Sequence, residues 1–563
     1  MKHFIFFVSS LLLFVVFIGH SQLKETHKEF QAPLDIPLLL AGTFGELRSN
    51  HFHSGLDIKT QKKENFEVQA IGSGFVKRIK IAHGGFGKVL YIEHPNGYTS
   101  VYAHLKKFAP SIEAYVQKQQ YNQETYEIEL FPKSNQIKVN KGELIALSGN
   151  TGSSSGPHLH FEIRETLSQK PVNPLLFGFD IADHQRPIIR NLVGYPLSES
   201  SVINTLNTPI QLIFKKVNDS LYTADPVHAI GTIGFGINTI DRQDLAYNQN
   251  GIFKISTHLN GALLQSFEMN KFSFKESSFI NTFIDYPRMK THRQKIIKLF
   301  KTKGNKLEFY TTSNKGSFLV KEGLNYVYSI KVSDFENNTV TLQIPIKGVQ
   351  QTASNSEEKK QGKVILTDRD YLYTFDKSSV YFAKNTFFED AIIDIKESGD
   401  TLVVENPLVP VYKNIKISYQ PDSIQKGDYL GIVSGKKSIN FVSSDHKKGV
   451  FKARTKALGK YIVGRDTLPP TIEPVNFEDG KWISNYRKLS FIIDDADTGI
   501  GHYRGTIDGK WVLFEYEYKK KSLTFTFDDY PLEGTKHFIE ITVKDKVGNS
   551  SQYNAVFYRK TYE

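Results

Sequence analysis

Five side chains that could do acid–base or metal chemistry fall in three short segments of the N-terminal third of this 563-residue chain: His53, Asp57, His104, His158 and His160. The third segment begins Gly156-Pro157, which disfavours a helix, so residues 158–160 should be extended. Side chains alternate faces along a strand, so His158 and His160 should project to the same side, with Leu159 toward the core. Two imidazoles on one face can reach the same small centre.

The chemistry that suits this set is metal-assisted hydrolysis. The chain contains no cysteine, so thiol nucleophiles, disulfides and Cys-ligated metals are excluded, and a metal site must use His, Asp or Glu. Zinc accepts His nitrogen and Asp oxygen at about 2.0–2.2 Å and, in catalytic sites, has three protein ligands and one open position. It lowers the pKa of bound water to about 7, and an uncoordinated histidine could then move the proton. The four histidines and one aspartate of the set thus exceed the three ligands required. His51 is a further candidate, because a strand would place it on the face of His53.

The motifs around these residues resemble the lysostaphin-type (LytM-like) zinc metallopeptidases. They are His53-x-x-x-Asp57, Tyr102-Ala103-His104-Leu105 and Gly156-Pro157-His158-Leu159-His160-Phe161-Glu162-Ile163, with supporting matches in 70–76, 96–98 and 139–145. The resemblance covers about residues 37–177 and implies a small, mostly antiparallel β fold with a groove. It implies cleavage of peptide bonds in bacterial peptidoglycan. By motif position it assigns His53, Asp57 and His160 as zinc ligands and His104 and His158 as uncoordinated catalytic histidines. The sequence departs from the family in a long insertion, 109–137, which puts the shape of the groove in question.

Two other patterns suggest weaker alternatives. Residues 152–156 match the G-x-S-x-G nucleophile motif, with Ser154 as the nucleophile, but that motif requires a following helix that Gly156-Pro157 excludes. The Asp-rich segments 334–338 and 494–497 could bind calcium. No complete ligand loop is present, so β-turns are the preferred interpretation. His83 and His94 lie beside turn signals, which predicts solvated side chains.

Composition favours a mostly β protein. Aromatic residues make up 13% of the chain while only 3 methionines occur, and such usage suits strands better than helical bundles. The expected fold is a small antiparallel β-barrel or sandwich metallopeptidase domain followed by Ig-like β-sandwich domains. The net charge of +12 is best explained by a lysine-rich surface, although attraction to an anionic envelope polymer is the alternative. No basic stripe with interleaved aromatics occurs, so nucleic acid is not expected as a partner.

The order of segments predicts several domains: a signal peptide (1–21), a metallopeptidase domain (22–185), an Ig-like domain (186–349), a linker (350–362), a β-rich domain (363–466) and a second Ig-like domain (467–563). The first segment begins with the basic residues Lys2 and His3 and continues with an apolar run over 4–18. Gly-His-Ser at 19–21 then supplies the small residues of a cleavage site, as in cleaved signal peptides. We therefore expect export to the periplasm, cell envelope or medium, without a transmembrane anchor in the mature chain. Strand, Asp and turn signals recur in the same order in the two Ig-like segments, which suggests a duplicated module. Within the insertion, the apolar spacing in 111–120 predicts a helix.

These observations favour an exported zinc endopeptidase that hydrolyses peptide bonds in peptidoglycan stems or cross-links. Two alternatives remain: a non-catalytic LytM-like regulator of another wall hydrolase, and a surface adhesin that acts through its β-sandwich domains. The complete ligand set favours the enzyme over the regulator. The expected partners are a peptidoglycan peptide as substrate and, through the C-terminal β domains, a component of the envelope.

Overall fold

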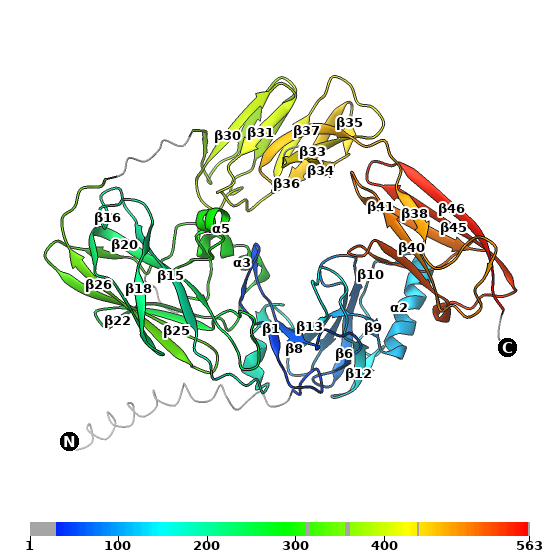
Figure 1. Ribbon diagram of the computed structural model, residues 1–563, viewed down its shortest axis with the longest axis horizontal. Helices are drawn as coiled ribbons and strands as arrows, with labels where there is room; N and C mark the ends of the chain where they lie inside the picture. The colour runs from blue at the N-terminus through cyan, green and yellow to red at the C-terminus, as the bar shows by residue number, and fades with distance from the viewer. Residues whose placement is uncertain (1–29, 311–314, 355–360, 436–437, 561–563) are drawn as a thin grey trace, which may run out of the picture.

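The computed structural model describes residues 30–310, 315–354, 361–435 and 438–560, so the expected signal peptide lies outside the described residues. Within them, no helix is both long and apolar enough to cross a membrane. The described chain is mostly β, as predicted, and its strands gather into separate sheets that follow one another around an open ring (Figure 1).

The N-terminal domain is built on one large antiparallel sheet. Its strand order is β1 (Leu40–Gly42), β4 (Leu56–Lys59), β13 (His158–Glu165), β8 (Tyr98–Leu105), β7 (Lys88–Glu93), β6 (Gly74–Ile81) and β10 (Ile128–Leu130). A second small sheet contains β5 (Glu67–Gln69), β12 (Leu144–Leu147) and β9 (Lys107–Phe108). Leu159 on β13 is fully buried, as the alternation predicts. The large sheet runs between two separate edge strands and does not close into a barrel, so the sandwich alternative describes the domain better.

The insertion adds one helix and one edge strand to this domain. Helix α2 (Pro110–Gln123) starts one residue before the predicted helix and ends three residues after it, with Pro110 in its first turn, where no backbone donor is needed. It buries Ile112 and Val116. The following strand β10 pairs with β6 and so extends the sheet at its edge. The insertion therefore lies at the far edge of the sheet from β4.

Three further β regions follow. The second region (186–349) has the strand order β17 (Ile210–Leu212), β15 (Ile188–Pro196), β20 (Val227–Ile240), β26 (Thr339–Gly348), β25 (Asn325–Ser333), β21 (Lys254–Leu259) and β22 (Ala262–Glu268). It also carries the short helices α3 (Phe274–Ser277), α4 (Ile280–Phe283) and α5 (Tyr286–His292).

The third region consists of two sheets. The first has the strand order β27 (Lys363–Ile365), β30 (Ala391–Ser398), β31 (Thr401–Glu405), β37 (Gly459–Arg465), β33 (Asp428–Ser434) and β34 (Ser438–Ser443). The second has the strand order β28 (Tyr371–Thr374), β29 (Ser378–Phe382), β32 (Ile415–Tyr419), β36 (Val450–Thr455) and β35 (His446–Lys447). The C-terminal region also consists of two sheets. The first has the strand order β38 (Thr471–Pro474), β40 (Lys488–Asp494), β44 (Ser522–Thr526) and β43 (Phe514–Glu517). The second has the strand order β39 (Lys481–Trp482), β46 (Ser550–Tyr558), β45 (Lys536–Asp545), β41 (Ile500–Ile507) and β42 (Lys510–Trp511).

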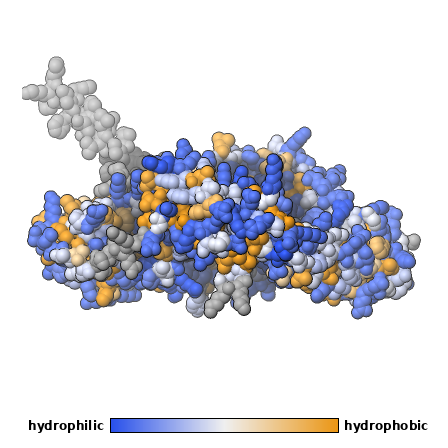
Figure 2. Space-filling view, turned by 90° about the horizontal axis from the view of Figure 1, so that it is seen from above, coloured by the Kyte–Doolittle hydropathy of each residue, from blue (hydrophilic) through white to orange (hydrophobic). Residues whose placement is uncertain are grey.

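The large clusters of buried hydrophobic residues are centred one in each of these regions. The domain division read from the sequence stays a prediction. The core of the second region also takes in Phe44 and Phe52 of the N-terminal domain, so these two regions share packed surface. The C-terminal region returns to the N-terminal domain, where β41 lies beside α2 (Figure 1). Seen from above, the molecule shows mainly hydrophilic residues, with hydrophobic ones in small scattered groups (Figure 2).

Candidate active site

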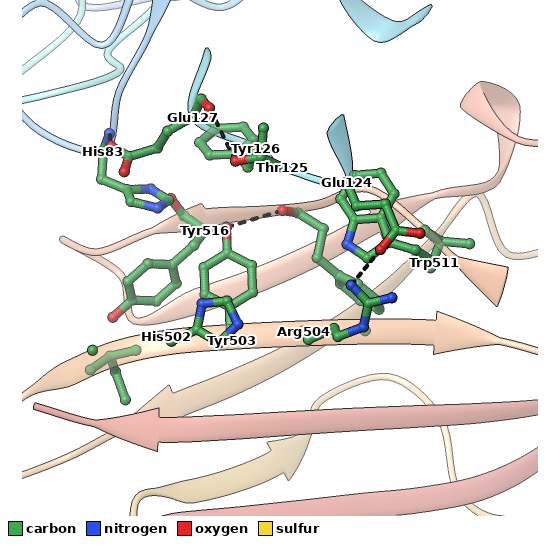
Figure 3. A pocket seen from close by; sticks show the side chains of 15 residues that line it. His83, Glu124, Thr125, Tyr126, Glu127, His502, Tyr503, Arg504, Trp511 and Tyr516 are labelled. Carbon is green, nitrogen blue, oxygen red and sulfur yellow. Dashed lines mark hydrogen bonds and ion pairs between the residues drawn. The ribbon is translucent and has the colours of Figure 1, made fainter. Parts of the chain in front are cut away.

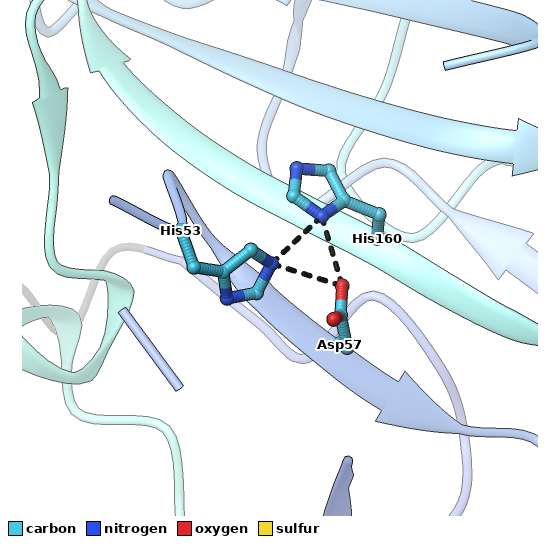
Figure 4. A group of neighbouring side chains, drawn as sticks. All are labelled: His53, Asp57 and His160. Atoms are coloured by element: carbon cyan, nitrogen blue, oxygen red, sulfur yellow. Dashed lines mark hydrogen bonds and ion pairs between the residues drawn. The ribbon is translucent and has the colours of Figure 1, made fainter. Parts of the chain in front are cut away.

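Three of the predicted residues converge at one point of the N-terminal sheet (Figure 4). His53 Nε2 lies 3.0 Å from Asp57 Oδ1 and 3.1 Å from His160 Nδ1, and His160 Nδ1 lies 2.9 Å from the same carboxylate oxygen. Asp57 on β4 and His160 on β13 are direct antiparallel partners, which brings together residues far apart in sequence. All three side chains are buried.

The hydrogen bonds behind the cluster decide which ring nitrogens face its centre. His53 Nδ1 donates to the Thr43 carbonyl at 2.8 Å, which leaves a lone pair on Nε2. His160 Nε2 donates to the Glu162 carboxylate at 2.8 Å, which leaves a lone pair on Nδ1. Two nitrogen lone pairs and one carboxylate oxygen therefore point at each other, an arrangement that a cation stabilises. This donor set fits a zinc ion.

A second layer of polar groups holds the ligands. Arg48 donates to Asp57 Oδ2 at 2.9 Å, so only the other carboxylate oxygen faces the two histidines. Glu162 is fully buried and accepts from Arg164 Nε and from the Ser54 hydroxyl, both at 2.5 Å. Such outer partners set the tautomer and orientation of metal-ligating histidines.

These contacts shift the pKa values of the cluster. Burial lowers the pKa of His160, but hydrogen bonds to the Asp57 and Glu162 carboxylates outweigh it and raise the pKa to about 9, so without a metal a proton occupies Nδ1, and a bound cation would take the place of that proton. Burial raises the pKa of Asp57, yet the facing histidines bring it well below its usual value. For Glu162, burial raises the pKa, but the charges and hydrogen bonds of Arg164 and His160 together outweigh burial and lower the pKa to about 2. The two carboxylates are thus held ionised beside the ligand nitrogens.

The two remaining histidines stand beside the cluster with their rings 4.8 Å apart. His104 Nδ1 donates to the Thr151 carbonyl at 2.9 Å, and His158 Nδ1 donates to the Gly156 carbonyl at 2.8 Å. In both rings Nε2 therefore carries the lone pair. His104 adopts a left-handed backbone with φ of 60° at the end of β8, a strained conformation of the kind found at functional sites.

A cavity of about 780 Å³ lies over the five residues. It is lined by the glycine loops 85–86 and 153–157, by His51, and by Phe274, Ser277 and Ser278 of the second region. Phe274 is fixed by the Arg164 guanidinium, 4.6 Å from its ring centre, and Ser277 accepts from the Phe52 backbone at 2.8 Å. The second region therefore supplies one wall of the groove.

The C-terminal region holds the opposite loop, residues 150–156. Lys519 Nζ donates to the Ser154 carbonyl at 3.1 Å and also to the Asn150 carbonyl, and the Tyr518 hydroxyl reaches the Gly152 carbonyl. Ser154 in turn donates to the Gly156 carbonyl, at 2.7 Å, the atom that also receives His158 Nδ1. Gly152 has φ of 72°, and a Cβ there would lie 2.3 Å from the Gly87 nitrogen, so only glycine lets the two groove loops pack this closely. The C-terminal region thus contacts the loop whose Gly156 carbonyl accepts the hydrogen bond from the His158 ring.

The rest of this inter-domain contact surrounds a smaller cavity (Figure 3). Arg504 forms an ion pair with Glu124 at 2.6 Å, and Tyr121 of α2 stacks on Tyr530 with ring centres 5.3 Å apart. His83, expected to be solvated, instead lies here, stacked on Tyr126 with its Nδ1 3.2 Å from the Tyr516 carbonyl. The insertion therefore forms part of the docking surface for the C-terminal region.

The structure brings together all five residues named from the sequence and excludes others. His51 lines the cavity, but its ring is exposed and hydrogen-bonds to the Ser49 carbonyl rather than joining the cluster. His94 is buried between Ser73 and Ser100, so its predicted solvation is wrong. Sequence reasoning missed Arg48 and Lys519. Arg48 is only nine residues before Asp57 and could have been considered, whereas no sequence signal links Lys519 to a loop 365 residues away.

Part of the N-terminal domain is similar to known proteins. Residues 51–121 and 127–174 match the model of peptidase family M23. Curated relatives include an uncharacterized metalloprotease of Haemophilus influenzae, 34% identical over 123 residues, which are 22% of this chain and 20% of that protein. The DD-carboxypeptidase/endopeptidase Mpg of Neisseria meningitidis is 31% identical over 129 residues (23% of each chain). The peptidoglycan DD-endopeptidase ShyA of Vibrio cholerae is 34% identical over 115 residues (20% of this chain, 21% of the relative). The chain thus spans only about a fifth of the length of these curated relatives.

Solved structures align with about a quarter of the chain. The catalytic domain of lysostaphin from Staphylococcus simulans aligns with 25% of this chain and 91% of its own, at 22% identity and a TM-score of 0.19. A zinc-containing peptidase from Vibrio cholerae aligns with 27% of this chain and 41% of its own, at 26% identity and a TM-score of 0.19.

Proposed function

Because residues 51–174 form a domain of peptidase family M23, we propose that this chain is an exported, zinc-dependent endopeptidase that hydrolyses peptide bonds in peptidoglycan stems or cross-links. The observation that carries the proposal is the pair of facing histidine lone pairs at the Asp57 carboxylate, beside two further histidines with free Nε2 atoms. Two of the relatives are named as peptidoglycan or DD-endopeptidases, which supports this substrate class. Export is supported by the signal-like first 21 residues.

His53, Asp57 and His160 would hold the zinc ion. When bound there, zinc supplies Lewis acidity toward a carbonyl oxygen and toward water. The protein's part is to orient the ligands: Thr43 holds the His53 ring, Arg48 holds one Asp57 oxygen, and Glu162 holds the His160 ring.

His158 is the better candidate for the general base. Its Nε2 lies 3.4 Å from Asp57 Oδ1 and is therefore at the ligand cluster, and its lone pair can accept the proton of an attacking water. The protonated ring can then donate to the leaving amine. The Gly156 carbonyl accepts from Nδ1 and keeps the ring oriented in both steps.

His104 has a different part. Burial, with the neighbouring His160 and His158, lowers its pKa to about 3, which makes it a weak base. Its Nδ1 proton is committed to Thr151, so Nε2 can accept a hydrogen bond but has no proton to give to an oxyanion. Holding a water molecule therefore suits His104, and stabilising an oxyanion does not.

Digestion of purified peptidoglycan tests the proposed function. We expect the purified chain to release muropeptides whose masses show hydrolysis of an amide, to lose this activity with a chelator and to regain it with about one equivalent of zinc. Full activity in metal-free protein would contradict the zinc mechanism. Products cut only in the glycan strand would contradict the endopeptidase assignment.

A further inference from the structure

Three aspartates meet where the N-terminal domain joins the second region. Asp183 lies in the connector between the two, Asp241 directly follows β20, and Asp334 directly follows β25. One carboxylate oxygen from each lies within 4.8 Å of the others. Asp241 and Asp334 are 3% and 2% exposed, and Asp183 is half-buried. We call these three residues the connector cluster.

The spacing of the connector cluster suits a calcium ion. Calcium binds carboxylate and amide oxygens at about 2.4 Å, so two of its ligands can be no more than about 4.8 Å apart. Among the described residues, no lysine, arginine or histidine forms an ion pair with any of the three carboxylates. Burial and the charges of Asp183 and Asp334 raise the pKa of Asp241 to about 9. Three clustered carboxylates without a compensating cation are unfavourable.

A separate observation points to a ligand. Asp241 Oδ1 and Gln243 Oε1 are buried oxygen atoms with no hydrogen-bond partner, and Gln243 is only 5% exposed. Both side chains line, together with Asp183, one small cavity of about 20 Å³. That volume is sufficient for one water-sized particle, since about 10–15 Å³ is needed. Orphaned buried acceptors are rare in folded proteins and require explanation. A cation in this cavity would satisfy both.

The C-terminal region provides an internal comparison. Asp466, Asp495 and Asp545 form a similar group there: Asp466 precedes the first strand, Asp495 directly follows a strand, and Asp545 ends a strand shortly before an Asn. Asn549 donates its backbone and side-chain N–H groups to Asp545, as Asn338 does to Asp334. We call these three aspartates the C-terminal cluster.

The C-terminal cluster differs in its donors. Asp545 Oδ1 accepts the backbone N–H groups of residues 547–549, at 2.6–2.9 Å. Asp495 Oδ1 accepts from the Thr498 and Gly499 backbones, and Asp466 Oδ2 accepts from the Thr498 hydroxyl at 2.7 Å. Among the described residues, none of its carboxylate oxygens is buried without a partner. The buried carboxylate oxygens of the C-terminal cluster thus have hydrogen-bond donors, whereas Asp241 Oδ1 of the connector cluster has none.

We propose that the connector cluster binds a calcium ion, with the Gln243 side-chain oxygen as a further ligand, and that the C-terminal cluster does not. The ion ties the connector, residues 178–187, to the ends of β20 and β25. Because the second region supplies Phe274 and Ser277 to the groove, calcium would fix one groove wall relative to the zinc ligands. The proposal does not depend on the proposed peptidase activity.

Calorimetric titration of the full, zinc-loaded chain with calcium chloride tests the proposal. We expect one calcium ion per chain with a Kd below about 1 mM. D241N should abolish this binding, and D495N, the matched change in the C-terminal cluster, should leave it intact. The proposal is overturned if wild type shows no saturable binding at millimolar calcium, if D241N binds as wild type does, or if D495N removes the binding. Magnesium binding as tight as that of calcium would overturn the choice of ion.

Thermal melting distinguishes a loss of calcium binding from a defect in folding. Calcium should raise the melting temperature of wild type and D495N but not that of D241N. Without calcium, D241N should melt at or above the wild-type temperature, because it replaces a buried, unpaired carboxylate by a neutral amide. If D241N does not fold, D183N on the half-buried connector residue takes its place, with the same expected loss of calcium binding. A calcium-dependent rise in melting temperature in the variant equal to that of wild type would overturn the proposal.

Discussion

Lys88 Nζ and Glu515 Oε1 lie 2.8 Å apart although 427 residues separate them in the chain. The Lys88 side chain is 4% exposed, whereas that of Glu515 is 47% exposed. Burial lowers the pKa of Lys88, but the charge and hydrogen bond of Glu515, together with the smaller contributions of Tyr126 and Glu113, outweigh it and raise the pKa above its usual value. The N-terminal domain therefore buries a charged lysine whose main compensating charge comes from the C-terminal region.

E515Q should weaken the docking of the C-terminal region. It leaves the buried Lys88 ammonium without a facing charge, and we expect a loss of about 1–3 kcal/mol, given that Glu515 is itself half exposed. Chemical or thermal unfolding measures the change, with E478Q on an exposed glutamate as the control. The double variant K88M/E515Q should recover much of the loss, because it removes the buried charge. Equal stability of E515Q and E478Q would show that the ion pair contributes little.

K519A should reduce hydrolysis while zinc binding is retained. Lys519 holds the loop 150–156, which orients His158 through the Gly156 carbonyl but carries no zinc ligand. Misplacement of a catalytic group by about 1 Å can reduce the rate by up to about 10²-fold. Rate and zinc content are measured together, with K520A on the neighbouring exposed lysine as the control. Loss of zinc in K519A, or equal rates for the two variants, would contradict a positioning role.

H160A and H158A should separate a metal ligand from an acid–base residue two positions away. H160A removes one of three ligands, so zinc content and activity should fall together. H158A leaves the three ligands in place, so zinc should remain near stoichiometric while the rate falls by about 10²–10⁴-fold. H104A should resemble H158A. The measurement is elemental zinc beside hydrolysis rate, with circular dichroism as the folding control. Complete loss of zinc in H158A would move His158 into the ligand set.

E162Q should reduce zinc affinity by about 10–100-fold without removing a ligand. The carboxylate of Glu162 fixes the His160 tautomer and balances Arg164, and the amide keeps the shape but not the charge. Competition with a chelator measures the affinity. The control is E165Q on the same strand, whose side chain pairs with Lys271 away from the cluster. Unchanged affinity in E162Q would show that its charge does not support the ligand.

His104 should stay uncharged between pH 5 and pH 8. Its folded-state pKa of about 3 lies below the unfolded value of about 6.5, so folding favours the neutral ring. Because folding lowers the pKa of His104, the stability that its neutral ring contributes is fully present above pH 6.5 and is lost as the pH falls toward 3. Histidine NMR with selective ¹³C labelling should show a ring signal, assigned with H104N, that does not move over pH 5–8. A titration midpoint near 6.5 would refute the neutral assignment.

Local features of the chain were predictable because their signals are local. The alternation around Leu159, the helix in 111–120 and the paired His158 and His160 all follow from spacing over a few residues, and the structure contains each of them. The failed predictions concern environment. His94 and His83 sit beside turns, yet one is enclosed by Ser73 and Ser100 and the other by the C-terminal region, neither of which a local pattern reports.

By itself, the sequence determined the chemistry available at the site: no cysteine, and five His and Asp side chains at spacings that suit a metal and an acid–base pair. Only the tertiary structure decided which nitrogen of each ring faces the centre, because that depends on the Thr43 carbonyl and the Glu162 carboxylate behind the rings. It also decided that Lys519 reaches the loop beside His158 and that Asp183 meets Asp241 and Asp334. Periodicity and spacing describe neighbours along the chain, whereas these contacts join segments that only the packing of separate domains brings within a few ångströms.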